Sequence, residues 1–119
     1  MSQNFQPGDF LIFQLESGFG LLRVLATEEN GGDPIWHLSA YQDLFLDVEM
    51  ADVALNNPEN LILSHPHLAL TNRAFESTQV AKMTNVPLTE QELVPLEVWE
   101  SFGNGEVSDR SVRLLLGLR

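Results

Sequence analysis

Residues 7–26, PGDFLIFQLESGFGLLRVLA, decide how the fold begins. Two apolar runs, Phe10–Leu15 and Leu21–Ala26, are separated by a connection that contains Gly18 and Gly20. Short apolar runs joined in this way are typical of a β-hairpin. Because glycine permits positive φ angles and bulges, we expect the hairpin to be bent.

A third strand is predicted at Ile35–Tyr41, after a loop whose Asn-Gly and Gly-Gly pairs favour turns. Side chains alternate between the two faces of an extended chain. The alternation assigns these residues to two faces: Trp36, Leu38 and Ala40 to one, and Ile35, His37, Ser39 and Tyr41 to the other.

A helix is predicted next, because apolar residues recur at helical spacing at Leu44, Val48, Ala51 and Leu55. Asp47 is a suitable N-cap, and Asn57-Pro58 would end the helix. We expect the cluster of residues 44–46 to anchor the incoming loop to the core.

A second helix is predicted after Thr89, which forms a capping box with Glu92. Its apolar stripe would contain Leu93, Leu96, Trp99 and Phe102. Pro95 lies inside this stripe, where it either kinks the helix or begins a second short one. We expect Gly103-Asn104-Gly105 to end the element.

Further short β segments are predicted at 61–63, 68–70 and 80–86. Pro66 lies between the first two and lacks an N–H donor, which favours an edge strand or a bulge. Residues 107–119 suit either a short helix capped by Ser108 or a closing strand at 112–116. Together these elements predict one α+β domain over residues 1–119, a small curved antiparallel sheet or partial barrel with two helices packed on it.

Charge is unevenly distributed along the 119 residues, which carry 17 acidic and 6 basic side chains and a net charge of −11. No Lys or Arg occurs between Arg23 and Arg73. The acidic residues of this stretch are Glu28, Glu29, Asp33, Asp43, Asp47, Glu49, Asp52 and Glu59. Such an excess repels phosphate, so we expect no binding to nucleic acid or anionic membranes. The acidic stretch either solubilises the protein or forms a face for a basic partner protein, with Glu49 and Asp52 as candidate contacts.

Cysteine is absent, which excludes disulfides, thiolate catalysis and Cys-based metal sites. The longest apolar run, Phe10–Phe13, is far shorter than the roughly 20 residues of a membrane span. The first nine residues lack the pattern of a secretory signal. These features favour a bacterial-type cytoplasm.

His65-Pro66-His67 would place two imidazoles on one face of an extended chain, an arrangement that can bind one metal ion. His37 or Glu59 could then supply a third ligand; otherwise the imidazoles are exposed on an edge strand. Neither a nucleophile elbow around Ser17 nor a dinucleotide loop at residues 18–20 is present. We therefore predict no catalytic residue and no cofactor.

Arg23 lies inside an apolar strand and is expected to pair with a carboxylate near the core. Trp36 and Trp99 lie on predicted apolar faces, which favours packing roles for both.

Several short segments resemble the start of SH3-like bacterial toxin-immunity proteins: Gly8–Phe13, Gly18–Gly20 and Arg23–Leu25. The second half is similar to small uncharacterised bacterial proteins with that opening, through His67–Leu70, Phe75, Thr89–Leu93 and Trp99. The resemblance covers about half the chain and consists of turns and core positions. It implies an SH3-like partial barrel and a protein-binding role, and it transfers no catalytic residue.

Two functions follow as hypotheses. The first is a non-enzymatic protein-interaction domain, immunity-like or adaptor, that holds a basic protein on its acidic surface. The alternative is a metal- or ligand-binding enzyme centred on His65 and His67. The sequence carries no signal for an oligomeric state.

Overall fold

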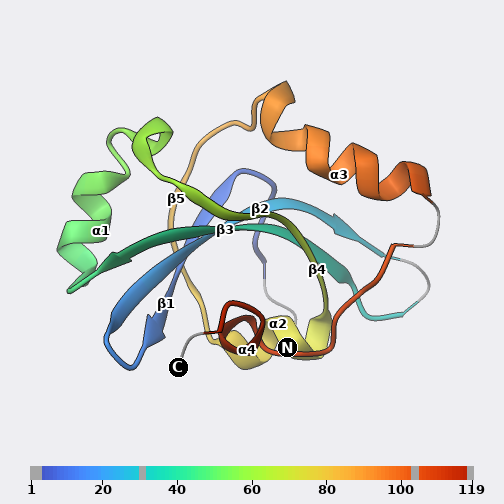
Figure 1. Ribbon diagram of the computed structural model, residues 1–119, viewed down its shortest axis with the longest axis horizontal. Helices are drawn as coiled ribbons and strands as arrows, with labels where there is room; N and C mark the ends of the chain where they lie inside the picture. Colours follow the sequence, from blue (N-terminus) through green and yellow to red (C-terminus); the bar gives the residue numbers. More distant parts are fainter. Residues whose placement is uncertain (1–3, 30–31, 103–104, 118–119) are drawn as a thin grey trace.

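The computed structural model describes residues 4–29, 32–102 and 105–117, and its centre is a five-stranded antiparallel sheet (Figure 1). The strands are β1 (Asp9–Leu15), β2 (Gly18–Glu28), β3 (Ile35–Phe45), β4 (Leu63–Thr71) and β5 (Ala81–Asn85), in the order β4-β3-β2-β1-β5. The predicted α+β class and the β1–β2 hairpin are confirmed. The hairpin itself keeps a regular register, and the irregularity after Gly20 lies in the pairing of β2 with β3. The sheet is open and does not close into a barrel.

Helices cover both faces of this sheet. They are α1 (Val48–Ala54), the 3-10 helix η1 (Pro58–Asn60), α2 (Asn72–Thr78), α3 (Glu90–Phe102) and α4 (Val112–Leu115). In Figure 1, α1, η1 and α3 lie above the sheet, and α2 and α4 lie below it. The two predicted helices correspond to α1 and α3, and α4 is one of the two alternatives left open for residues 107–119, so the structure adds α2 and η1. No helix within the described ranges has the length and apolar content that a membrane crossing needs.

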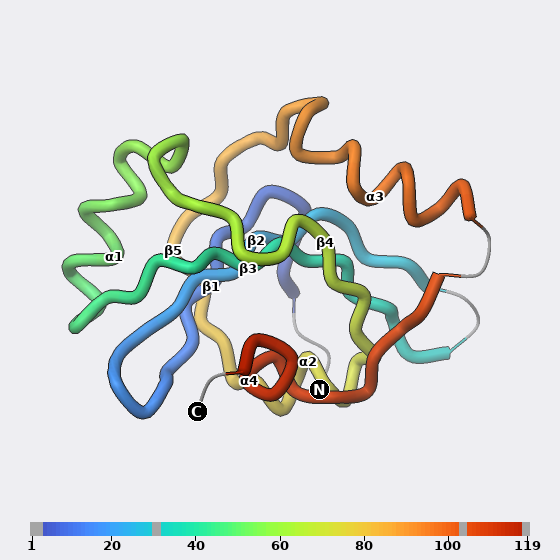
Figure 2. Tube along the Cα trace, viewed as in Figure 1, coloured from blue at the N-terminus to red at the C-terminus, as the bar shows by residue number. Residues whose placement is uncertain are grey.

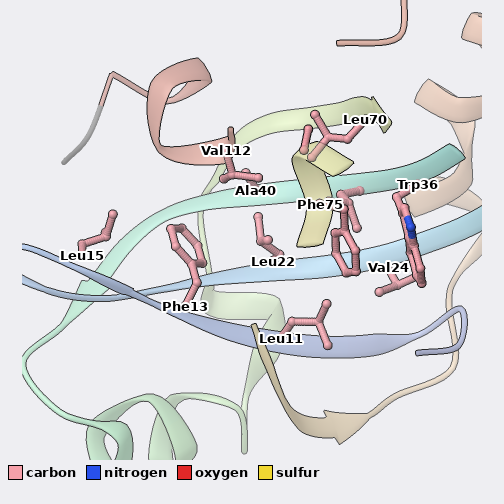
Figure 3. Close-up of a cluster of buried hydrophobic side chains, with 12 residues drawn as sticks. Leu11, Phe13, Leu15, Leu22, Val24, Trp36, Ala40, Leu70, Phe75 and Val112 are labelled. Atoms are coloured by element: carbon pink, nitrogen blue, oxygen red, sulfur yellow. The ribbon is translucent and has the colours of Figure 1, made fainter. Parts of the chain in front are cut away.

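The larger core lies between the sheet and the α2–α4 pair (Figure 3). It contains Trp36, Leu38 and Ala40, which confirms the predicted face of β3. Trp36 stacks on Phe75 of α2 with ring centroids 4.1 Å apart, and Phe75 is fully buried. These contacts hold α2 against the sheet.

The smaller core lies under α1 on the other face. It contains Phe10, Ile12, Leu21 and Tyr41 from the strands, with Ala51 and Leu55 from α1. Asp47 caps α1, as predicted, by accepting a hydrogen bond from the Met50 N–H at 2.8 Å.

The expected anchor at residues 44–46 is wrong. Leu44 and Phe45 belong to β3, which stays paired with β2 as far as Phe45 opposite Phe19. The extended backbone turns Leu44 outward, and Leu46 is 78% exposed. Phe45 alone packs against the smaller core.

The edge strand β4 is one continuous element rather than two short stretches. Its register against β3 shifts near Pro66, where Ala40 lies opposite His65 and Leu38 lies opposite Leu68. The predicted bulged edge strand is therefore confirmed. The segment before α4 runs beside β4 (Figure 2), and Ser108 exchanges backbone hydrogen bonds with Ala69 and Thr71 at 2.8 and 2.9 Å.

The capping box of α3 is confirmed, because Thr89 Oγ1 accepts from the Glu92 N–H at 3.2 Å and Glu92 Oε1 accepts from the Thr89 N–H at 3.0 Å. Pro95 sits inside α3 without ending it. Phe102 does not belong to the buried stripe, since it is 73% exposed. The expected stop at residues 103–105 begins at Gly103 and Asn104, which lie outside the described residues.

The end of the chain contains a helix and not a strand. Ser111, rather than Ser108, caps α4 by accepting from the Leu114 N–H. Ser108 instead forms the backbone bridge to β4, and its hydroxyl accepts from the Arg110 N–H at 3.1 Å.

Replacing Phe75 by alanine should cost about 3–5 kcal/mol of stability, because it empties the centre of the larger core. Phe102→Ala is the matched control on α3, and its free energy of unfolding should stay within about 0.5 kcal/mol of the parent. Urea unfolding of the two variants measures the difference. Equal losses would contradict the packing described.

Candidate functional site

A cleft of about 480 Å³ lies on the face of the sheet that α1 and α3 share. Its floor is formed by Phe10, Arg23, Ser39 and Tyr41, from the three central strands. Its walls come from η1, the start of β4, the segment before α3 and the first turns of α3. Four of the chain's six prolines line it: Pro58, Pro66, Pro87 and Pro95. The volume falls within the range of roughly 300–1,000 Å³ found for ligand sites.

Arg23 is the charged group in the floor, and it is 2% exposed. Its Nε and Nη2 donate to the two carboxylate oxygens of Glu92 at 3.0 and 3.1 Å. Nη1 donates to the Gly8 carbonyl at 2.7 Å, and the guanidinium lies 4.2 Å from the centroid of the Phe10 ring. The predicted carboxylate partner of Arg23 is therefore real, and it ties the first turn of α3 to β2.

Glu92 is fully engaged within the protein. Burial raises the pKa of its carboxyl, but hydrogen bonds from Arg23 and from Thr89 outweigh burial and hold that pKa below its usual value. The carboxylate therefore stays ionised, and the pair with Arg23 carries no net charge.

Tyr41 is the polar residue of the floor whose side chain has no hydrogen-bond partner among the described residues. It is 8% exposed, and no described residue forms a hydrogen bond with its hydroxyl. Every fully enclosed side-chain polar atom of the described residues has a partner, so this hydroxyl opens onto the cleft. Burial raises the pKa of Tyr41 to about 12, which keeps the phenol neutral. Ser39 beside it donates to the Pro66 carbonyl at 2.9 Å.

A second cluster joins His37, His67 and Trp99 near the far end of α3. His37 Nδ1 and His67 Nε2 share a hydrogen bond of 2.9 Å, and the two rings stack with centroids 5.2 Å apart. The Trp99 ring lies edge-on to His37, at 4.9 Å between centroids. Trp99 therefore packs, as expected, but against two imidazole rings rather than in the apolar core.

Both imidazoles of this cluster are held neutral. Burial and, to a smaller extent, the neighbouring His37 lower the pKa of His67 to about 4. Burial also lowers the pKa of His37, although Glu28 and Glu100 partly offset that effect.

The structure brings His67 to His37, whereas the ring of His65 bonds to the adjacent Ser64 hydroxyl at 2.9 Å. Within the described ranges, no three side chains of the metal-binding types are grouped to hold an ion. The metal hypothesis for His65 and His67 stays a prediction. Glu49 and Asp52, the candidate partner contacts, are exposed on α1.

Glu92→Gln should lower stability by about 2–4 kcal/mol, because it leaves the buried Arg23 guanidinium without its counter-charge. The control is Glu97→Gln, an exposed position on the same helix, which should change stability by less than about 0.5 kcal/mol. Thermal or urea unfolding compares the two. An equally small loss for both would show that the ion pair contributes little.

Acid should destabilise the protein through the His37–His67 pair. Because the folded state favours neutral imidazoles, this stability is complete above about pH 6.5 and is lost as pH falls toward about 4. His67→Gln should flatten the dependence of unfolding free energy on pH in that window. His65→Gln is the control and should keep the parental dependence of unfolding free energy on pH. If His65→Gln flattened this dependence and His67→Gln did not, the His37–His67 pair would not be its source.

In comparisons with known proteins, no family model, curated protein or solved structure matches the chain.

Proposed function

We propose that the chain is a cytoplasmic, non-enzymatic protein-interaction domain, immunity-like or adaptor, that binds a basic protein. The binding surface would be the acidic face, which we define as the exposed carboxylates of α1, η1 and α3 together with the cleft between them. Those carboxylates belong to Glu49, Asp52, Glu59, Glu90, Glu97 and Glu100.

Charge supports this face. The sequence has no Lys or Arg at residues 24–72, nor at residues 83–109, and these two stretches supply α1, η1, β4 and α3. Arg23 reaches the cleft from below, but Glu92 neutralises it. The field over the face therefore has a single sign, which attracts and steers a basic partner.

Exposed apolar side chains accompany the carboxylates. On α3, Val94, Val98 and Phe102 follow at spacings of four residues and are 49%, 48% and 73% exposed. Residues four apart lie on the same side of a helix, so α3 presents an apolar stripe outward as well as contacts toward the sheet. On α1, Met50 and Val53 are 48% and 66% exposed. Protein interfaces combine such apolar patches with a polar rim.

The cleft is the observation that carries the proposal. A solubilising acidic surface needs no hollow, yet a mainly apolar cleft of about 480 Å³ opens among these carboxylates. Its floor is held by the Arg23–Glu92 pair, so it exists before any partner arrives. Preorganised surfaces lose less entropy on binding.

The alternative of an enzyme centred on His65 and His67 gains no comparable support. Neither histidine is among the residues that line the cleft. His67 Nε2 is already engaged by His37.

A random peptide library selected on the purified chain tests the proposal. Enriched peptides should contain an excess of Lys and Arg. Their association should slow as salt rises from 0.01 to 0.1 M, since the Debye length falls from about 30 Å to about 10 Å. The double variant Glu49→Lys/Asp52→Lys should slow association by about tenfold or more.

The matched control is Glu16→Lys/Asp33→Lys, which changes the net charge equally but alters exposed residues in the β1–β2 and β2–β3 connections. It should bind the same peptides nearly as fast as the parent. Peptides without basic residues, or equal slowing by both double variants, would overturn the acidic-face proposal.

A further inference from the structure

We infer that the cleft is the receptor for a single tyrosine side chain of the basic partner, inserted so that its hydroxyl meets Tyr41. This inference rests on the proposed function and names the group that anchors the partner. It follows from four features of the cleft: its rings, its free hydroxyl, its neutral floor and its acidic surroundings.

The lining suits a flat, rigid ring. The rings of Phe10 and Tyr41 lie 5.9 Å apart in the floor, and the four prolines add pyrrolidine rings that lose no side-chain freedom on binding. Leu61, Leu63 and Val86 complete the apolar walls. Pockets of this kind at interfaces bind aromatic anchors.

The Tyr41 hydroxyl determines which hydrogen-bonding group the inserted side chain should carry at its end. A neutral phenol can donate one hydrogen bond and accept others. Because the Tyr41 O–H has no acceptor among the described residues, a ligand that displaces water from this hydroxyl keeps it paired only by bringing an acceptor atom. The indole of tryptophan is only a donor, and phenylalanine offers neither, whereas a tyrosine hydroxyl does both. The Ser39 oxygen, which donates to Pro66, can still accept a hydrogen bond beside it.

Charge disfavours a carboxylate and a cationic side chain as the anchor. A carboxylate would offer oxygens, but Glu59 stands at the rim and Glu92 already saturates the Arg23 guanidinium on its Nε and Nη2 side. A Lys or Arg side chain pushed to the floor would approach Arg23 itself. The neutral floor therefore selects an uncharged ring, while the carboxylates outside select basic residues on either side of it.

Four small molecules that share a tolyl ring test the floor: p-cresol, toluene, 4-methylbenzoate and 4-methylbenzylammonium. We expect p-cresol to perturb the amide NMR signals of residues around the cleft and to bind more tightly than the other three. Tyr41→Phe should weaken the binding of p-cresol by about fivefold, which corresponds to the loss of one neutral hydrogen bond. The affinity for toluene should not change.

Tyr41→Phe removes no hydrogen bond within the described residues, so the variant should keep the parental fold and melting temperature. Tighter binding of the anion or the cation, or equal binding of p-cresol to both proteins, would overturn the inference. Either failure leaves the peptide selection on the acidic face unaffected, so the two proposals fail separately.

Blocked tripeptides distinguish a partner's side chain from a free phenolic molecule. Lys-Tyr-Lys should bind more tightly than p-cresol and more tightly than Lys-Phe-Lys, with an affinity that decreases as salt rises. A tripeptide that binds no better than p-cresol would show that the occupant is a small phenol, which contradicts a protein anchor.

Discussion

A guanidinium that is 2% exposed cannot remain in a folded protein without a counter-charge, and this constraint on Arg23 organises the upper half of the molecule. Removing an ion from water costs several kcal/mol, which only close pairing and hydrogen bonding recover. Glu92 supplies both, and Thr89 holds Glu92 in place through the capping box. The start of α3 is thereby fixed above β2, and the space that remains beside the pair is the cleft.

One face of the sheet carries the larger core, and the opposite face carries the cleft. The face under α2 and α4 carries the larger hydrophobic core, and Trp36 stacked on Phe75 shows how closely it packs. The opposite face places Arg23, His37, Ser39 and Tyr41 among apolar neighbours, and α1 and α3 cover it only in part. Each of these polar residues except Tyr41 finds a protein partner. The cleft, its neutral floor and its single free hydroxyl all follow from that distribution.

Much of the fold was predictable because local signals agreed with tertiary structure. Alternation along Ile35–Tyr41 assigned both faces of β3 correctly, and the Thr89–Glu92 box located α3. Leu44 was misassigned because helical spacing continued into residues that the β2 ladder keeps extended. The helix α2 was missed since its seven residues contain only one large apolar side chain, Phe75. The site was less predictable: the contacts of Arg23 with Glu92 and of His37 with His67 join residues 69 and 30 positions apart, for which one sequence offers no signal.

Native-state hydrogen exchange of α3 measures most directly whether the ion pair fixes this helix and so preforms the cleft. The amides of α3 around Leu96 should exchange with nearly the same opening free energy as those of β2 around Leu22. In Arg23→Met the α3 amides should exchange much faster while the β2 amides stay protected, because helix and sheet are uncoupled. Rapid exchange of α3 in the parent protein, with β2 protected, would contradict a cleft that exists before its partner binds.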